Sequence, residues 1–188
     1  MPAIDLVMLP AAAHASHIAA LKDEKKARRV RYIGVQVIAD NVYSQIEAMM
    51  RNEPIDFIGV DYDVGNRARV EDTILPLGQE RKTGVMAFFP LGNASGYSCA
   101  PATNLFTRVA NRPLPEWAAD FDATTWAQFV LKYVISHTAV TVAVWEPRSR
   151  RTWSTTLAAA FGRLPDEATR KRMAELIDSL PAPAPPGR

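Results

Sequence analysis

Residues 55–62 read Ile-Asp-Phe-Ile-Gly-Val-Asp-Tyr, and this stretch decides the fold. Most of its residues are apolar, which is typical of a parallel strand with both faces covered. Four further runs of the same kind predict strands elsewhere in the chain. They span residues 4–9, 30–37, 84–89 and 140–145.

Stretches with helical periodicity separate the predicted strands. After the second strand, for example, Val42, Ile46 and Met49 recur at helical spacing behind a cap at Asp40 or Asn41. Strands that alternate with helices indicate right-handed βαβ units and a parallel sheet. The other helices are predicted at residues 14–29, 70–80, 124–136 and 153–161 and from Pro165 onward, whereas residues 92–122 are expected to be irregular.

The predicted fold class is α/β, a partial TIM barrel of about five βα units plus a C-terminal helix. Five units are too few to close an eight-stranded barrel of roughly 250 residues. Periodicity alone does not separate a barrel fragment from an open, doubly wound sheet. The sequence has no GxGxxG or GxxxxGK phosphate loop, which disfavours an open sheet that binds nucleotides.

Length and composition favour one domain at residues 1–180, followed by a proline-rich, flexible tail at residues 181–188. The chain has 188 residues, 48% hydrophobic and 22% charged, and a formal net charge of +2. These values are typical of a globular protein and give no reason to expect a nucleic-acid partner. The single cysteine excludes an internal disulfide. Because we find no signal peptide or membrane-spanning run, we expect a cytoplasmic protein that does not bind membranes.

Nine short segments carry a resemblance to a known family. They are residues 4–7 (IDLV), 31–35 (RYIGV), 55–62 (IDFIGVDY), 74–77 (ILPL), 114–118 (LPEWA), 126–129 (WAQF), 131–133 (LKY), 139–141 (AVT) and 162–167 (GRLPDE). Taken together and in order, they resemble aldo-keto reductases, particularly bacterial ones related to the twin-arginine-exported group. The resemblance covers nearly the whole chain and implies that the five predicted strands are the family's fourth to eighth strands.

The resemblance also implies which parts of the family's chemistry are missing. Aldo-keto reductases reduce carbonyls with NADPH through an Asp, a Tyr, a Lys and a His, and the first three belong to strands outside the matched region. Pro10 falls at the position of the histidine, and proline neither exchanges protons nor donates a hydrogen bond. Gln36 and Gly59 replace a Ser or Thr and a Gln that hold the cofactor, while Phe88 could still stack on nicotinamide. We therefore expect no cofactor, with NADP possible only if that site is partly retained.

Polar residues at the predicted strand ends are the candidate catalytic groups, because barrel enzymes carry their chemistry there. They are Asp61, Asp63, Gln36 and Glu146. Asp61 and Asp63 lie two residues apart and point to one side of a strand, where two carboxylates could share a proton or bind a cation. Solvated strand-end acids with no function are the alternative.

Aromatic and basic residues near the same strand ends are the candidate ligand contacts. These candidates are Phe88, Phe89, Trp145, Arg148, Arg150 and Arg151. The aromatic residues could line an apolar pocket, although Trp145 could equally fill an incomplete core. The three arginines follow the last strand, where many barrels bind phosphate, and a solvated basic turn is the other interpretation.

The remaining motifs favour ordinary structural interpretations, and we expect no metal. His14 and His17 lie three apart near a helix start and are weak metal candidates, since no acid–histidine signature accompanies them. Cys99 lies in a predicted loop with no histidine near it in the sequence. The basic stretch at residues 22–31 also contains two acids and is expected to be a solvated helix face.

The first and last predicted strands would leave open edges in a partial barrel. Unpaired strand edges and exposed apolar surface favour association. We therefore expect a homodimer or another oligomer that covers the edges. The alternative is that residues 92–122 fold back over the opening.

Three functional hypotheses follow. The first is a truncated, repurposed protein that binds or converts a small organic molecule. Its chemistry would be acid–base chemistry such as isomerisation, dehydration or cyclisation, with a role in biosynthesis. The second is a non-catalytic binding or partner subunit. The third is an NADP-dependent oxidoreductase of the aldo-keto reductase family. If the protein is an enzyme, isomerase or lyase chemistry is favoured over NADPH-dependent reduction.

Overall fold

The computed structural model describes residues 3–10, 15–37, 43–92, 105–145, 154 and 156–181. The strands in these residues form one five-stranded sheet. They are β1 (Ile4–Pro10), β2 (Val30–Val37), β3 (Phe57–Asp61), β4 (Gly84–Phe88) and β5 (Val140–Val144). Each strand is parallel to its neighbours and lies close to its predicted position.

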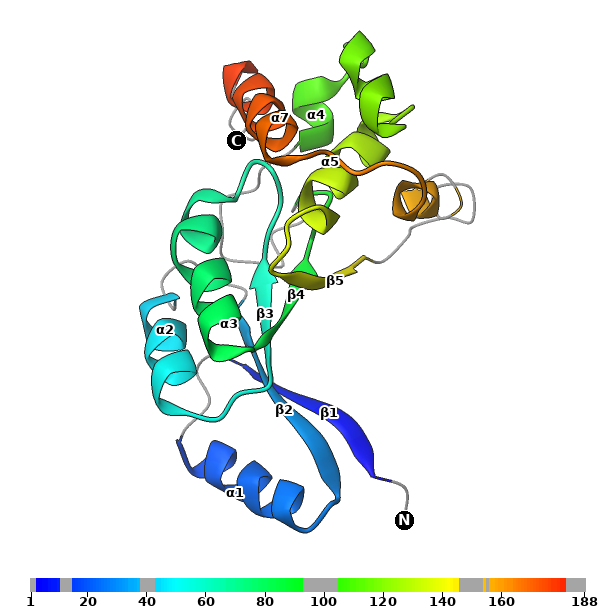
Figure 1. The fold of residues 1–188 in the computed structure, drawn as a ribbon. Coiled ribbons are helices and arrows are strands. Elements are labelled where there is room, and N and C mark those ends of the chain that lie inside the picture. The colour runs from blue at the N-terminus through cyan, green and yellow to red at the C-terminus, as the bar shows by residue number, and fades with distance from the viewer. Residues whose placement is uncertain are drawn as a thin grey trace, which may run out of the picture.

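The strand order separates the two topologies that periodicity leaves open. A doubly wound sheet reverses its order at a switch point, whereas a barrel adds each new strand beside the last. The order β1-β2-β3-β4-β5 is of the barrel kind, so right-handed crossovers put the connecting helices on one face. Figure 1 shows α1 (Ala15–Lys26), α2 (Tyr43–Asn52) and α3 (Leu75–Arg81) along that face. The predicted partial barrel is confirmed.

The core lies between the sheet and these helices. Side chains alternate between the two faces of a strand, and Val35, Ile58, Val60 and Val85 are completely buried on the helix side. Ile46 of α2 is buried against them. Removing side chains of this size from water contributes about 1.5–3 kcal/mol each to stability.

The opposite side of the sheet is called the inner face here, and large side chains cover glycines on it. Its residues are Leu6 and Met8 of β1, Tyr32, Gly34 and Gln36 of β2, Phe57, Gly59 and Asp61 of β3, and Gly84, Met86 and Phe88 of β4. A Cβ added at Gly34 would lie 2.1 Å from Met8 Sδ, and one at Gly84 would lie 2.6 Å from Phe57 Cε1. The inner face is therefore filled by side chains from neighbouring strands, as barrel interiors are.

Side chains cap the starts of two described helices, whereas the cap predicted at Asp40 or Asn41 lies outside the described residues. Thr125 accepts a hydrogen bond from Gln128 N and begins α5 (Trp126–Ile135). Asp166 accepts one from Thr169 N at 2.8 Å and begins α7 (Glu167–Ser179). The helix predicted at residues 70–80 is present as η2 (Val70–Ile74) followed directly by α3. Each side-chain cap satisfies a backbone N–H that has no partner within the helix.

The expectation of an irregular segment at residues 92–122 was wrong for its second half. This part contains α4 (Leu105–Val109) and η3 (Glu116–Phe121). Arg108 donates hydrogen bonds to main-chain oxygens at the end of α7, including Ile177 O at 2.6 Å. Phe121 of η3 stacks against Phe129 of α5, with ring centroids 5.6 Å apart. Residues 105–122 thus pack on α5 and α7, and they do not fold back over the inner face.

The basic stretch at residues 22–31 is only partly a solvated helix face. Lys25 forms an ion pair with Asp56, with Nζ 2.6 Å from Oδ2, and Lys22 forms one with Glu53. Both acids precede β3, so these pairs join α1 to the start of that strand. The sequence suggested neither partner, because each acid lies 31 residues from its lysine.

Within the described ranges, no helix combines the length and the apolar character needed to cross a membrane. Short 3-10 turns complete the described secondary structure, among them η4 (Ala158–Ala160). Of the predicted flexible tail, only Pro181 belongs to the described residues.

Candidate functional site at the carboxyl ends of the strands

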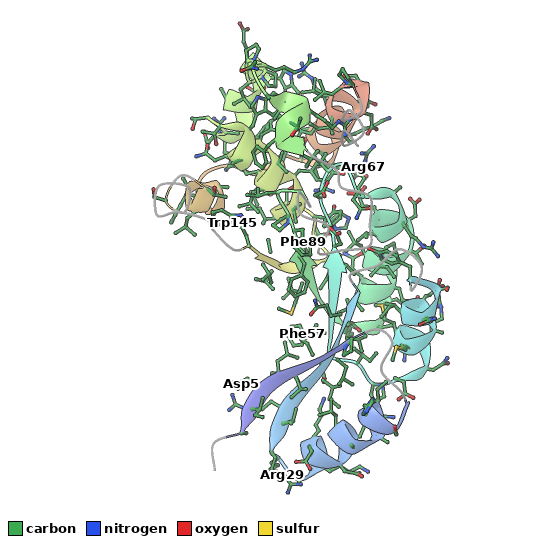
Figure 2. All side chains as sticks on the ribbon, turned by 180° about the vertical axis from the view of Figure 1, so that it is seen from behind. Asp5, Arg29, Phe57, Arg67, Phe89 and Trp145 are labelled. Atoms are coloured by element: carbon green, nitrogen blue, oxygen red, sulfur yellow. The ribbon has the colours of Figure 1, made fainter. Side chains whose placement is uncertain are left out.

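The parallel sheet brings the predicted strand-end residues to one edge. In the register of the sheet, Gln36 pairs with Gly59, and Asp61 pairs with Phe88. Trp145 directly follows β5, whose Val144 pairs with Phe88. Figure 2 shows Phe89 and Trp145 at the same end of the sheet, with Phe57 farther toward the other end. Residues from four strands therefore share one rim.

Asp61 is the acid that belongs to the inner face. Its neighbours in the chain, Val60 of β3 and Tyr62 directly after it, are on the helix side, where the Tyr62 hydroxyl donates a hydrogen bond to Glu71 of η2 at 2.6 Å. Because side chains alternate along a strand, Asp61 points the other way. It is only 1% exposed, so its carboxylate is held away from bulk water at the rim.

Asp63 has a different environment, and the two acids do not form a matched pair. Its Oδ1 accepts hydrogen bonds from Gly65 N at 2.6 Å and from Asn66 N at 3.0 Å. This is an Asx turn, in which a short acidic side chain satisfies the backbone of the next residues. Asp63 is 0% exposed, so the alternative of solvated strand-end acids was wrong for both residues. The contacts of Asp63 are those of a turn former.

Phe88 and Phe89 end β4 at the rim in two different ways. Phe88 lies across Gly59, where an added Cβ would meet Phe88 Cε2 at 2.4 Å. Phe89 has a φ of 52°, in the left-handed region that bulky side chains rarely adopt. Such backbone strain costs about 1–3 kcal/mol and is found most often at active sites and ligand-binding sites. The hydrogen bond from Gly92 N to Phe89 O, at 2.8 Å, closes the turn that maintains this conformation.

Gln36 and Trp145 complete the described part of the rim. The Gln36 side chain is half-buried and makes no hydrogen bond with any residue in the described ranges. Its amide can therefore donate to and accept from a ligand. Trp145 is partly buried and packs against the main core, which agrees with the interpretation that it fills an incomplete core.

The remaining predicted site residues fall into two groups. Glu146, Arg148, Arg150, Arg151, His14 and Cys99 lie outside the described residues and stay predictions. His17 is described and is exposed on α1. Among the described residues, no group of three or more His, Cys, Asp or Glu is arranged to hold a metal ion.

A polar cluster behind the rim was not predicted from the sequence. The Glu71 carboxylate accepts hydrogen bonds from the hydroxyls of Tyr62 and Tyr133, at 2.6 and 2.7 Å, and forms an ion pair with Arg170 at 2.7 Å. Arg170 also lies over the Tyr133 ring, 4.1 Å from its centroid. Burial raises the pKa of both tyrosine hydroxyls, and the hydrogen bonds to Glu71 raise them further.

This cluster joins β3, η2, α5 and α7 at the point where the chain leaves Asp61. Tyr62 and Arg170, which share a hydrogen bond in this cluster, are 108 residues apart in the sequence. No short motif contains them, so no sequence signal could have identified the cluster. The only local hint is the acid at Glu71, nine residues after Tyr62.

Solved structures with a similar architecture include several aldo-keto reductases. An aldo-keto reductase from Bacillus halodurans, in its holo form, matches with a TM-score of 0.67 and 20% identity over 93% of this chain. The chain has the fold of part of an aldo-keto reductase barrel. An aldo-keto reductase from Klebsiella pneumoniae in complex with NADP and acetate matches with a TM-score of 0.63 and 18% identity over 99% of the chain. A glycerol dehydrogenase from Gluconobacter oxydans matches with a TM-score of 0.65 and 17% identity, also over 99%.

The aldo-keto reductase fold is present only in part. The chain covers 61% of the Bacillus protein and 62% of each of the other two. No family model matches the sequence, and no curated protein matches it. At these identities the likeness to aldo-keto reductases establishes the fold, and the chemistry has to be argued from the residues of the rim.

Proposed function

We propose that this partial barrel binds a small organic molecule at the rim and acts on it by acid–base chemistry without hydride transfer. The observation that carries the proposal is the Asp61 carboxylate, which is buried on the inner face beside Phe88. Ligand sites in barrels lie at this end of the strands, in apolar surroundings with a few polar groups. Gln36 supplies a second polar group on the adjacent strand.

The rim does not fit NADP as the family's rim does. The resemblance puts a cofactor-holding Gln at Gly59, but here the Phe88 ring occupies the space that such a side chain needs. Pro10 stands at the position of the catalytic histidine and cannot transfer a proton. These contacts favour chemistry that needs no cofactor.

A carboxylate at this position would serve as a general base and then as a general acid. It would remove a proton from a carbon or hydroxyl of the ligand and return it at another atom, which balances an isomerisation. Returning the proton to a leaving hydroxyl gives dehydration. Gln36 would orient a carbonyl or hydroxyl oxygen of the ligand, and Phe88 and Phe89 would contact its apolar part.

Ligand-detected NMR with a library of small hydroxy and keto compounds tests this proposal. We expect hits for the wild-type chain that disappear in Asp61→Asn and weaken in Gln36→Ala. Asp178→Asn, a change at an exposed acid on α7, serves as the matched control and should retain them. Hits that persist in Asp61→Asn would reject the proposal. A separate fluorescence titration with NADPH is expected to show no binding, and saturation below millimolar cofactor would favour the reductase alternative.

The second candidate function is a non-catalytic partner subunit, and the free edges of the sheet favour it. Ile4 of β1 and Val142 of β5 are 57% and 43% exposed, although both are apolar. A homodimer that covers these edges therefore stays a prediction. It is compatible with ligand binding at the rim, because the two polar groups proposed to contact the ligand, Asp61 and Gln36, lie on the interior strands β3 and β2.

A further inference from the structure

β1 is an edge strand without the features that usually protect an edge. In the described part of the chain its only sheet neighbour is β2. The four central residues, Leu6 to Leu9, are apolar but only partly buried. Protected edges carry lysine, an interior proline or a bulge, whereas β1 has a proline only at its end, Pro10. Its backbone and side chains are thus ready to pair.

The sequence of β1 is complementary to itself. In an antiparallel pair centred on Val7, Val7 would face its own copy, and Leu6 would face Met8 of the second copy. Directly opposed residues in such a pair point to the same face of the sheet. Leu6 and Met8 would therefore pack with their copies on the inner face, next to Tyr32, which is 46% exposed. Apolar side chains that water now reaches would gain apolar neighbours from the second copy on both faces.

The one charge on the strand does not oppose this pairing. Asp5 forms an ion pair with Arg31 of β2, with 2.6 Å between Oδ1 and Nη1. In the register centred on Val7, Asp5 faces Leu9 of the second copy. The two Asp5 residues are then four positions apart along the strands, about 13 Å. That separation exceeds the Debye length of about 10 Å at ordinary salt, so repulsion between them is small.

We propose that a second copy of this chain docks on the free edge of β1, antiparallel and centred on Val7, to form a two-fold, ten-stranded sheet. The other edge is the weaker candidate, because β5 has five residues and β1 has seven. A two-fold axis through Val7 satisfies the requirement that a symmetric dimer uses the same patch on both subunits. This inference deepens the partner-subunit candidate and does not depend on a ligand at Asp61.

The first test is cross-linking in a Cys99→Ser background. Val7→Cys is expected to form a disulfide-linked dimer on mild oxidation, because each Val7 faces its copy. Val142→Cys, at an exposed position on the opposite edge, is the matched control and should stay unlinked. Linking through Val142→Cys but not Val7→Cys would place the contact on β5 and overturn the proposal.

The second test is sedimentation of the unmodified chain at micromolar concentration. We expect twice the chain mass of 20.7 kDa. Val7→Lys should shift the protein to the monomer, because lysine is a typical edge-blocking residue, while Val142→Lys should leave the dimer intact. A monomeric wild-type chain, or a dimer that survives in a folded Val7→Lys variant, overturns the proposal. If circular dichroism shows that Val7→Lys is unfolded, the cross-linking result decides.

Discussion

The ring of Phe88 occupies the space above Gly59 on the inner face, so the two residues are coupled across β3 and β4. A Cβ at Gly59 would lie 2.4 Å from Phe88 Cε2 and 3.2 Å from Met8 Cε. Real Cβ atoms do not come this close to a ring carbon. Any side chain at Gly59 therefore requires the Phe88 ring to shift.

We predict that Gly59→Ala destabilises the protein by about 1–3 kcal/mol, the usual cost of overpacking. Phe88→Ala in the same chain should relieve the overlap, so the double variant should cost less than the sum of the two single changes. Urea unfolding of the four proteins measures the coupling energy. Gly65→Ala, at an exposed turn position, is the control and should have a small effect. Additive single-variant costs would contradict the packing of Phe88 over Gly59.

The Glu71 cluster should contribute strongly to stability. Glu71→Leu leaves Arg170 and two tyrosine hydroxyls without their acceptor, and we expect a loss of about 3 kcal/mol, as for other half-broken buried pairs. Asp72→Asn, at the exposed neighbouring position, should change stability by less than about 0.5 kcal/mol. Urea unfolding measures both variants. Equal losses would show that the cluster does not join α7 to the rest of the fold.

The same cluster predicts an alkaline limit to stability. The pKa values of Tyr62 and Tyr133 are raised in the folded state by burial and by Glu71. The unfolded chain therefore releases these protons first, so stability falls as the pH rises above about 10. In a spectrophotometric titration, two of the five tyrosines should ionise only when the chain unfolds. Ionisation of all five while the chain is still folded would contradict this prediction.

An acid limit should come from Asp122. Hydrogen bonds from Arg163 hold the pKa of this carboxyl far below its usual range, with the Arg163 side chain contributing more than its backbone N–H. The stabilisation is present above the pKa of this carboxyl in the unfolded chain, about 3.9. It is lost as the pH falls toward the lower pKa of the folded state. The difference in melting temperature between wild type and Asp122→Asn should therefore shrink from pH 5 to pH 2. Asparagine tolerates the left-handed backbone at this position, where φ is 57°. A difference that stays constant with pH would show that the ion pair is absent.

The two strand-end acids should respond differently to substitution. Asp63→Ala removes the acceptor for Gly65 N and Asn66 N, and we expect a loss of about 1–2 kcal/mol. Asp61→Asn preserves the shape of the side chain and should abolish ligand binding at a smaller cost in stability. Thermal unfolding and ligand-detected NMR, measured on both variants, separate the roles. Loss of binding in Asp63→Ala at full stability would reverse the assignment.

Much of the fold could be predicted because its signals are local. The apolar runs at β2 and β4 and the start of α7 close to Pro165 each depend on residues within a few positions of one another. The segment at residues 92–122 was the main error, since η3 is stabilised by packing of Phe121 on Phe129 of α5. That contact has no counterpart in local periodicity.

The sequence by itself determined the βα repeat, the positions of the strands and the placement of Gln36, Asp61 and Phe88 near their carboxyl ends. Each of these depends on alternation and capping over short distances. Only the tertiary structure decided that the sheet winds in one direction, that Asp63 turns into its own loop while Asp61 stays on the inner face, and that Phe88 fills the space at Gly59. Those outcomes depend on which strands become neighbours and on how side chains share one volume, and both arise from contacts between residues far apart in the chain.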